Sequence, residues 1–394
     1  PELANPMLKY ELTQLVVITG AIQDSHRAFK PYYIGRICPL NTPQTDQVGL
    51  VQTLASGARI NEEGFIVLQV IDCNEGETHW LSVKEQSKSW IAYENPQKHK
   101  SGSMIPAFNK ETISQNISVD QASYYVAEED QLFGIIANMI PYRQYNDPTR
   151  GTMACAFLRQ ALPLVNGSEP KTNPKKFQKF CTEEHYGTEL LTAYMPWYGW
   201  NFEDAVVISR SASKQLSSSH KSHYRFILQR DWVDQEIQIL GNSLYFDYFG
   251  INLNNYDKCG IIKPGVRVKA NQPLIIETIG NEQQQPNFIV LPENECGGIV
   301  QSVRQAEWLD KDQQRAVSII TIQEIKPAQV GDKLTNRHGQ KGVISRISAD
   351  HEMPYIIIDK QKTIDCECGE NRLHEHMQLL INPLSVFSRF NIGQ

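Results

Sequence analysis

The sequence predicts a mixed α/β, β-rich protein of several domains. The chain has 394 residues, enough for roughly two to four domains with cores of their own. Its composition is that of an ordinary globular protein, with 41% hydrophobic and 21% charged residues. Short β-branched and aromatic runs, bounded by glycine, proline and asparagine, recur along much of the chain and are typical of strands.

The first hundred residues predict a small β-rich domain. Two apolar runs, at 64–71 and 79–83, flank the turn-forming segment 72–76, and both runs are typical of strands. Residues 94–112 contain two prolines, a glycine and several lysines, so we expect a loop there.

The centre of the chain predicts helices followed by a strand. Residues 131–163 carry a longer mixture of apolar and polar side chains that suits helices, whereas the proline- and lysine-rich segment 164–180 predicts a second loop. Residues 205–208 (Ala-Val-Val-Ile) predict a strand. A short helix is expected over 209–219, with a serine near its start.

The third quarter predicts an all-β module. Between Tyr224 and Ile325 short strand candidates recur, bounded by turn signals such as Lys-Pro-Gly at 263–265. Residues 283–286 (Gln-Gln-Gln-Pro) are expected to form an exposed loop of this module.

Charge and cysteine usage narrow the function classes. The formal net charge of -6 excludes a generally basic protein, so any nucleic-acid contact must come from locally concentrated charge, as in residues 326–346. The eight cysteines form no repeating framework, which favours a reducing compartment. No apolar run is long enough to span a bilayer, so we expect no membrane partner.

The segment 331–342 is the strongest candidate site and reads Gly-Asp-Lys-Leu-Thr-Asn-Arg-His-Gly-Gln-Lys-Gly. Glycines let the backbone approach a ligand closely, and Lys333, Arg337 and Lys341 supply donors for phosphate oxygens. The spacing is not that of a Walker phosphate loop. The pattern predicts a loop that holds a polyanion, with a solvated basic hairpin as the alternative.

Two adjacent carboxylates form a second candidate site. Glu203 and Asp204 follow the aromatic segment 193–202 and precede the strand expected at 205–208. Charged residues most often lie in solvated turns, which is the alternative. The aromatic context favours a functional pair, because a wall of rings around two carboxylates is costly unless the acids are used.

Four zinc-type ligands lie close together near the end of the chain. Cys366, Cys368, His374 and His376 offer thiolate and imidazole donors. Their C-x-C spacing is tighter than the C-x-x-C usual for zinc. We therefore expect a polar insertion with incidental ligands, and no zinc in this chain.

Together these motifs closely resemble the β-type, second-largest subunit of multisubunit DNA-dependent RNA polymerases of bacterial or plastid type. Residues 331–342 match the family pattern G-D-K-x-x-x-R-H-G-x-K-G, residues 34–43 match its fork element, and Ser-Arg-Phe-Asn-Ile-Gly-Gln at 388–394 matches its late arginine element. The resemblance runs from Asn5 to Gln394. It implies the central-to-C-terminal portion of a subunit that is split or only partly represented.

The resemblance also implies a fold. A double-psi β-barrel would be assembled from the regions 190–208 and 330–394, with a flap or wall β module inserted between them. The implied domains are a fork and external region at 1–125, a first hybrid-binding part at 126–222, the β module at 223–325 and a second hybrid-binding part at 326–394.

Single residues take implied roles in the same way. Lys333 and Lys341 would reach the RNA 3′ end and the phosphates of the incoming nucleotide. Arg389 and Arg150 would lie on the triphosphate, and Met153 would lie under the nucleotide base.

Metal and nucleic-acid contacts are implied as well. Glu203 and Asp204 would orient the second, nucleotide-borne Mg²⁺ through water, while the largest subunit would bind most of the magnesium. The residues implied to contact nucleic acid are Arg36, Arg159, Gln160, Lys333, Arg337, His338 and Lys341.

The activity implied is transcription of DNA into RNA, and not by this chain alone, because the family's aspartate loop for the first Mg²⁺ is absent from the sequence. Implied partners are the largest (β′) subunit, α subunits, the remaining β fragment, a σ-type factor, template DNA, the RNA transcript and nucleoside triphosphates. We expect the plastid (chloroplast) stroma, with bacterial cytoplasm or a phage-infected cell as the alternative. A non-catalytic RNA-binding or scaffold module derived from such a subunit is the alternative function.

Overall fold

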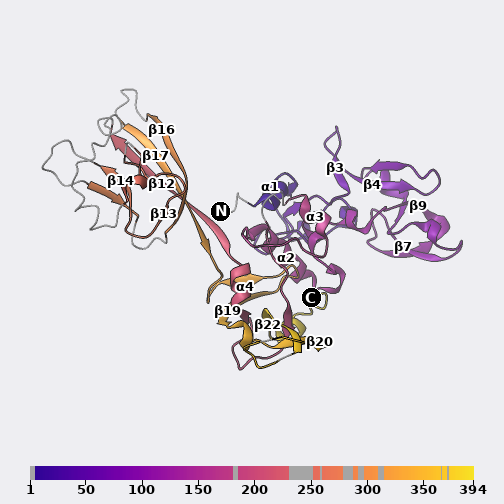
Figure 1. Ribbon diagram of the computed structural model, residues 1–394. Coiled ribbons are helices and arrows are strands. Elements are labelled where there is room, and N and C mark those ends of the chain that lie inside the picture. The colour runs from indigo at the N-terminus through magenta and orange to yellow at the C-terminus, as the bar shows by residue number, and fades with distance from the viewer. Residues whose placement is uncertain are drawn as a thin grey trace. The chain divides into compact units, whose positions relative to one another are not determined.

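The structure is a computed structural model that describes residues 5–180, 185–229, 252–257, 260–277, 287–291, 297–308, 315–364, 366–370 and 372–394. The chain divides into two compact units. The first consists of Pro1–Leu216 and Ala328–Gln394, and the second of Ser217–Pro327 (Figure 1). No helix in the described part of the chain has the length and apolar character needed to cross a membrane.

The N-terminal part of the first unit is built around a seven-stranded sheet with the order β3-β4-β9-β6-β7-β8, in which β5 pairs with β4. Its strands are β3 (Ala58–Ile60), β4 (Ile66–Asp72), β5 (Thr78–Leu81), β6 (Trp90–Ala92), β7 (Met104–Phe108), β8 (Gln115–Ser118) and β9 (Ala122–Tyr125). Leu68, Ile91 and Phe108 are fully buried in its core. The two strands expected from the apolar runs are confirmed.

The loop expected over 94–112 is wrong in part, because β7 lies inside it. Ile105, Ala107 and Phe108 are buried in the sheet, and this burial outweighs the local proline and glycine signals. Pro106 keeps its place in β7, where its carbonyl accepts a hydrogen bond from the Tyr93 amide at 3.2 Å.

The same unit also contains a largely helical region. It contains α1 (Pro6–Leu12), the antiparallel pair β1 (Leu15–Val17) and β2 (Val51–Thr53), α2 (Pro148–Gln160) and α3 (Pro174–Gln178). Helix α2 begins where expected for its sequence: the Asp147 side chain accepts from the Thr149 amide, and Pro148 occupies the first helical position. Its buried face, with Ala154, Cys155 and Leu158, packs on Met7 and Ile136.

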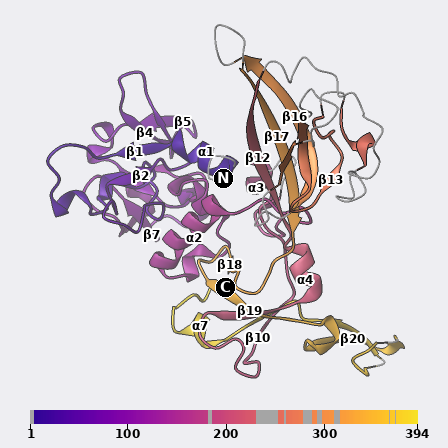
Figure 2. The same ribbon diagram turned by 90° about the vertical axis from the view of Figure 1, so that its left-hand side faces the viewer.

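The C-terminal part of the first unit contains a five-stranded sheet with the order β10-β22-β11-β19-β18. Its strands are β10 (Thr192–Tyr194), β11 (Ala205–Ser209), β18 (Lys333–Thr335), β19 (Lys341–Ser348) and β22 (Leu379–Ile381), and Figure 2 shows several of them with α4 (Arg210–Gln215) and α7 (Leu384–Phe387). Strand β11 is parallel to β19 and antiparallel to β22. Among the described residues this sheet is open, so the closed double-psi barrel is not seen.

The strand expected at 205–208 is present as β11, and the helix expected over 209–219 is present as the shorter α4, since β12 begins at Ser218. Val206, Val207 and Ile208 are buried, as predicted for an apolar run at the centre of a sheet. The Ser209 side chain caps α4 by accepting from the Ala212 amide at 3.1 Å.

A hairpin, β20 (Tyr355–Thr363) and β21 (Arg372–His376), extends from this sheet. Met353 before it and Met377 after it are buried with Val207 and Leu380. The base of the hairpin is therefore anchored in the core beneath β11.

The described residues of the second unit are mainly strands, with one short 3-10 helix at Leu253–Asn255. One sheet has the order β12-β17-β16-β13, and β14 pairs antiparallel with β15. Its strands are β12 (Ser218–Gln229), β13 (Arg267–Val268), β14 (Pro273–Glu277), β15 (Asn287–Val290), β16 (Gly298–Trp308) and β17 (Arg315–Lys326). The loop expected at 283–286 lies outside the described residues. The mixed, sheet-rich, multidomain fold class is confirmed.

Candidate functional site

The basic segment 331–342 forms an antiparallel hairpin of β18 and β19, with Lys333 opposite Val343 and Thr335 opposite Lys341. Because opposed residues and alternate residues share a face of a sheet, Lys333 and Lys341 lie on the same face of the hairpin. Lys333 is exposed and Lys341 is half-buried. The hairpin therefore presents two ammonium groups in one direction.

The tip of this hairpin is held by its own side chains. Asn336 Oδ1 accepts from the amides of His338 and Gln340, both at 3.0 Å. Gly339 has a φ of 82° and lies against helix α2, since a Cβ there would be 2.1 Å from the Arg150 carbonyl oxygen. Only glycine allows this approach without a backbone shift.

The base of the hairpin is fixed against the acidic pair. The Val343 amide donates to the Asp204 carbonyl oxygen at 2.9 Å, next to the parallel pairing of β11 with β19. A Cβ on Gly342 would lie 2.7 Å from the same Asp204 oxygen. The start of β11 and the basic hairpin are thus joined through their backbones.

Four charged side chains from four segments meet here. Arg389 Nη1 lies 2.5 Å from Asp204 Oδ1, and the charges of Lys341 and Arg150 also act on this carboxylate. The Arg389 hydrogen bond lowers the pKa of Asp204, while partial burial opposes the shift. Burial and the neighbouring Arg389 lower the pKa of Arg150. Asp147 also acts on Arg150, so the cluster combines three cations with the carboxylates of Asp204 and Asp147. Its guanidinium and ammonium groups are donors that suit an anion.

Met153 lies beside Arg150 on the same helix. Arg150 Nη1 is 3.2 Å from Met153 Sδ and 3.4 Å from the Gly339 carbonyl oxygen. Both side chains start from the first turns of α2, whose N-terminus faces the tip of the basic hairpin at Gly339.

The acidic pair itself lies at a tight turn. Glu203 is exposed and has a left-handed φ of 53°. Buried Asn201 fixes the turn by accepting from the Trp197 amide at 2.8 Å and donating to the Met195 carbonyl at 2.7 Å. The adjacent carboxylates of Glu203 and Asp204 therefore start from a rigid backbone.

The aromatic wall expected around the carboxylates is wrong. Tyr198 is 86% exposed and Phe202 is 68% exposed, so their rings face solvent and do not enclose the acids. Trp200 is 46% exposed and is covered on one face by the Arg346 guanidinium, 5.3 Å from the ring centre. Exposed rings of this size beside a charged cluster are typical of surfaces that bind another molecule.

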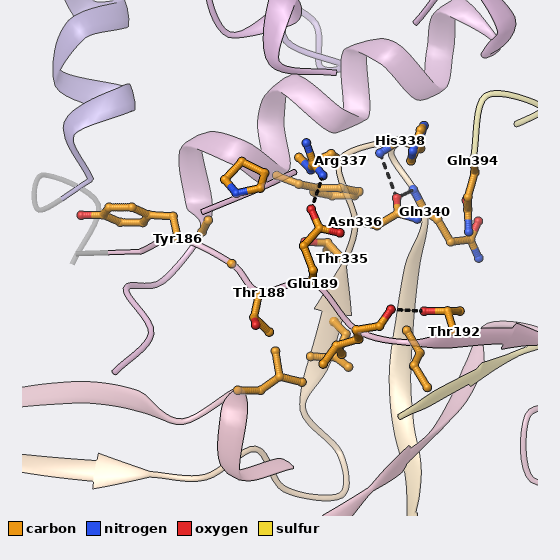
Figure 3. A pocket seen from close by; sticks show the side chains of 18 of the residues that line it. Tyr186, Thr188, Glu189, Thr192, Thr335, Asn336, Arg337, His338, Gln340 and Gln394 are labelled. Atoms are coloured by element: carbon orange, nitrogen blue, oxygen red, sulfur yellow. Dashed lines mark hydrogen bonds and ion pairs between the residues drawn. The ribbon is translucent and has the colours of Figure 1, made fainter. Parts of the chain in front are cut away.

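Arg337 is held inside the chain. Its Nη2 lies 2.8 Å from Glu189 Oε1, and its Nη1 donates to the Thr172 hydroxyl at 2.9 Å. Figure 3 shows the Arg337 and Glu189 side chains pointing toward each other. Its expected contact with nucleic acid stays a prediction, and Glu189 would compete for the guanidinium.

His338 is half-buried and faces Asn146. Asn146 Nδ2 lies 3.1 Å from His338 Nδ1, while Asn146 Oδ1 accepts from the Gly393 amide at 2.9 Å. This second bond fixes the amide orientation, so Nδ1 must accept and the ring is neutral with its proton on Nε2. Burial, aided by Arg337, lowers the pKa of His338 to about 4. At neutral pH it can contact RNA or DNA only as a neutral ring.

We expect His338 to make folding stability depend on pH. The folded pKa of about 4 lies below the ordinary 6.5, so the unfolded chain binds the proton first, and stability falls as pH drops from about 6.5 toward 4. Between pH 7 and pH 4.5 the wild type should lose about 2 kcal/mol more unfolding free energy than His338→Gln. Urea denaturation at both pH values measures this, with exposed His351→Gln as the control. Equal losses for all three proteins would contradict the assignment.

Three further residues implied to contact nucleic acid lie away from the cluster. Arg36 is only 2% exposed, and its guanidinium donates to the Leu81 carbonyl and to Gln86 Oε1 at 2.6 and 2.5 Å. Arg159 Nη1 is 2.5 Å from Glu11 Oε1, and Gln160 is exposed at the end of α2. In this chain the two arginines tie segments together, and all three nucleic-acid contacts stay predictions.

A cavity of about 350 Å³ borders the hairpin (Figure 3). Thr335 and Lys341, which oppose each other on the hairpin, both line it. Its other walls come from the end of α2 and from segment 185–194. The hairpin therefore borders an accessible space, which Lys341 lines and Lys333 does not.

A separate group of potential metal ligands lies on the β20–β21 hairpin. One donor atom from each of Cys366, Cys368, His374 and His376 lies within 4.8 Å of all the others. The tight C-x-C spacing did not predict this. The fold brings all four donors together.

Sequence reasoning missed Asn146 and Glu189, which position His338 and Arg337. Their partners lie 192 and 148 residues away along the chain. Nothing in the local sequence signals such pairs.

The chain belongs to the RNA polymerase Rpb2 family, because the domain described as "RNA polymerase Rpb2, domain 6" matches residues 136–394, well over half of the chain. "RNA polymerase Rpb2, domain 3" matches residues 14–60. The basic hairpin, the acidic pair, Arg150, Met153 and Arg389 all lie within the domain 6 match.

Among curated relatives, the chain is similar to the DNA-directed RNA polymerase subunit beta of Prochlorococcus marinus strains NATL2A and MIT 9515. In each case the identity is 24% over 490 aligned residues, which covers 95% of this chain and 42% of the relative. The chain thus spans less than half the length of these relatives.

Proposed function

We propose that this chain supplies one side of the active site of a DNA-directed RNA polymerase, as a portion of its β subunit. The observation that carries the proposal is the meeting of Lys341, Arg150 and Arg389 around Asp204, inside the region that matches Rpb2 domain 6. Cationic donors on a rigid frame are what a nucleoside triphosphate and an RNA end require.

The proposed reaction is attack of the RNA 3′-hydroxyl on the α-phosphorus of a nucleotide, with loss of pyrophosphate. Lys333 and Lys341, on one face of their hairpin, would neutralise phosphate charge near the RNA end as it develops. Arg389 and Arg150 would hold the triphosphate with planar guanidinium donors. Met153, 3.2 Å from Arg150, would lie under the base.

Glu203 and Asp204 would take part through magnesium. Two carboxylates at one turn, one of them already paired with Arg389, are too few to hold Mg²⁺ directly. They fit an ion that keeps its water shell and is bound mainly by another chain. When bound, such an ion would neutralise phosphate charge.

A shared site also accounts for the apolar surface around these residues. Phe387, Phe390 and Ile392, next to Arg389 in the sequence, are each more than 70% exposed, as is Tyr198 before the acidic pair. Such side chains favour a partner surface, and the proposed partners are the largest (β′) subunit, α subunits, the remaining β fragment and a σ-type factor.

Strand β22 lies between the consecutive strands β10 and β11, as in a psi loop, and we propose that it contributes to a double-psi barrel.

The alternative proposal is a non-catalytic RNA-binding or scaffold module. Arg389 and Asp204 neutralise each other in the isolated chain, which favours a surface without a catalytic role. The exposed Lys333 and the full cationic set favour catalysis. Activity in the assembled complex distinguishes the two.

The test is reconstitution. This chain, combined with a largest subunit that carries the aspartate loop and with the other core subunits, is expected to extend an RNA primer on a DNA template. The chain alone should not, because its acidic pair lacks the ligands for catalytic Mg²⁺. An assembled complex that binds RNA without extending it would support the scaffold alternative. Extension by the isolated chain would contradict the shared site.

A further inference from the structure

We propose that Cys366, Cys368, His374 and His376 bind a structural Zn²⁺ that closes the β20–β21 hairpin. This site lies apart from the basic hairpin and does not depend on the proposed polymerase activity. Two thiolates and two imidazoles are the donor set of many structural zinc sites. One donor atom of each residue lies within 4.8 Å of the other three.

The hairpin geometry explains how such short spacings can converge. His374 and His376 are two residues apart on β21, so their side chains lie on the same face. The connecting segment folds back over this face. Cys366 Sγ lies 3.5 Å from His376 Nε2, and Cys368 Sγ lies 3.3 Å from His374 Nε2.

Two of these separations match the edges of a zinc tetrahedron. With Zn–S near 2.3 Å and Zn–N near 2.0–2.1 Å, tetrahedral ligands lie about 3.3–3.8 Å apart. The two sulfur–nitrogen distances, 3.5 and 3.3 Å, fall in this range, and the two imidazole Nε2 atoms are slightly closer, at 3.1 Å. The other donor separations are at most 4.8 Å, so the four donors already surround a space of the size that a zinc ion needs.

The histidine rings are also oriented for a cation. His374 Nδ1 lies 2.7 Å from the Arg372 carbonyl oxygen, and His376 Nδ1 lies 3.0 Å from the Met353 carbonyl oxygen. With their protons on Nδ1, both rings direct an Nε2 lone pair toward the other ring and toward a cysteine sulfur. A metal ion at this point would be bound by both nitrogens and both sulfurs, and the carbonyls orient the rings as is usual around zinc.

Backbone amides are likewise directed at the two sulfur atoms. The Cys368 amide approaches Cys366 Sγ, and the Glu370 amide approaches Cys368 Sγ, each at 3.5 Å. Backbone N–H groups directed at sulfur stabilise thiolates. Four protein ligands leave no open position, so the ion would be structural and not catalytic.

The hairpin needs such a clip because its strands bury little apolar surface. Tyr355, Ile356 and Ile358 of β20 are 39%, 44% and 57% exposed. The residue after His376 is buried Met377, and β22, which lies between β10 and β11 in the five-stranded sheet, begins two residues later. The ion would hold the segment that leads into this strand.

The test is metal analysis of the full chain purified under reducing conditions in zinc-containing buffer. We expect about one zinc per chain after dialysis, and less than about a tenth of that in Cys366→Ser/Cys368→Ser and in His374→Ala/His376→Ala. The matched control, Cys73→Ser/His99→Ala, changes a cysteine and a histidine in the region of the seven-stranded sheet and should keep its zinc.

Co²⁺ titration of the wild-type chain gives a second measurement that needs no variant. Tetrahedral Co²⁺ should show intense visible d–d bands and thiolate charge transfer, and zinc should displace it. The control should bind Co²⁺ as the wild type does, whereas the two ligand variants should bind it more than about 100-fold more weakly. The absence of these bands, equal zinc in wild type and ligand variants, or a Cys366–Cys368 disulfide in place of metal would each overturn the proposal.

Discussion

Replacement of Lys341 or Lys333 by alanine is expected to slow nucleotide addition by about 10²–10³-fold in the reconstituted polymerase. The two ammonium groups share a face of the β18–β19 hairpin, so both would act on the same phosphate-rich region. Charge placed on a rigid frame stabilises the transition state without reorganisation, which is why its loss lowers the rate. Single-turnover primer extension at saturating nucleotide measures this step.

Complex assembly should change little in these variants, because neither lysine is buried in a core. The matched control is Lys221→Ala, an exposed strand lysine of the all-β unit, which should extend RNA at the wild-type rate. Near-normal rates for both hairpin variants would show that the active-site assignment is wrong. Loss of assembly in place of rate would give the lysines a structural role.

Arg389→Ala is expected to raise the nucleotide concentration for half-maximal rate by about 10–100-fold, with a smaller change in maximal rate. A guanidinium on the triphosphate binds the ground state as well as the transition state. In the isolated chain the same guanidinium lies 2.5 Å from Asp204. The variant therefore also removes the guanidinium with which Asp204 forms its ion pair.

A double variant separates these two effects. If Asp204 and Arg389 act as a pair, Arg389→Ala/Asp204→Asn should be less impaired than the sum of the two single variants in free-energy terms. Arg346→Ala is the control, since this arginine covers Trp200, lies 3.6 Å from Glu352 and is not one of the charges named as acting on Asp204. Unchanged nucleotide dependence in Arg389→Ala would remove this residue from the triphosphate site.

Local sequence signals predicted the elements that depend mainly on residues close to one another in the chain. The apolar run of β11 and the serine cap of α4 were readable because strand and cap depend on neighbouring residues. Strand β7 was missed, since its burial between β6 and β8 outweighs Pro106 and the nearby glycine. The two-residue spacing of Cys366 and Cys368 did not indicate that their sulfurs lie near His374 and His376, because this proximity depends on the segment that folds back over β21.

The candidate site was predicted as a set of residues, but not as an arrangement. Motifs pointed to Lys341 and Asp204, yet the pairing of Asp204 with Arg389 joins residues far apart in the chain. The acceptors that bury Arg36 come from residues 30 to 50 positions away, so its role inside the sheet domain was not readable. Partners that are distant in the sequence therefore determine which arginine side chains are available to contact a ligand.

The glycine contacts of the basic hairpin have a mechanical consequence. Gly339 lies against the backbone of Arg150, and Gly342 lies against the backbone of Asp204, so close main-chain approaches fix the hairpin at its tip and at its base. Such contacts do not loosen when a side-chain rotamer changes. Helix α2, the hairpin and the start of β11 should therefore move as one rigid body in the proposed polymerase. In a motion that opens the site, Arg150 and Lys341 would move together, and the distance between them would stay constant.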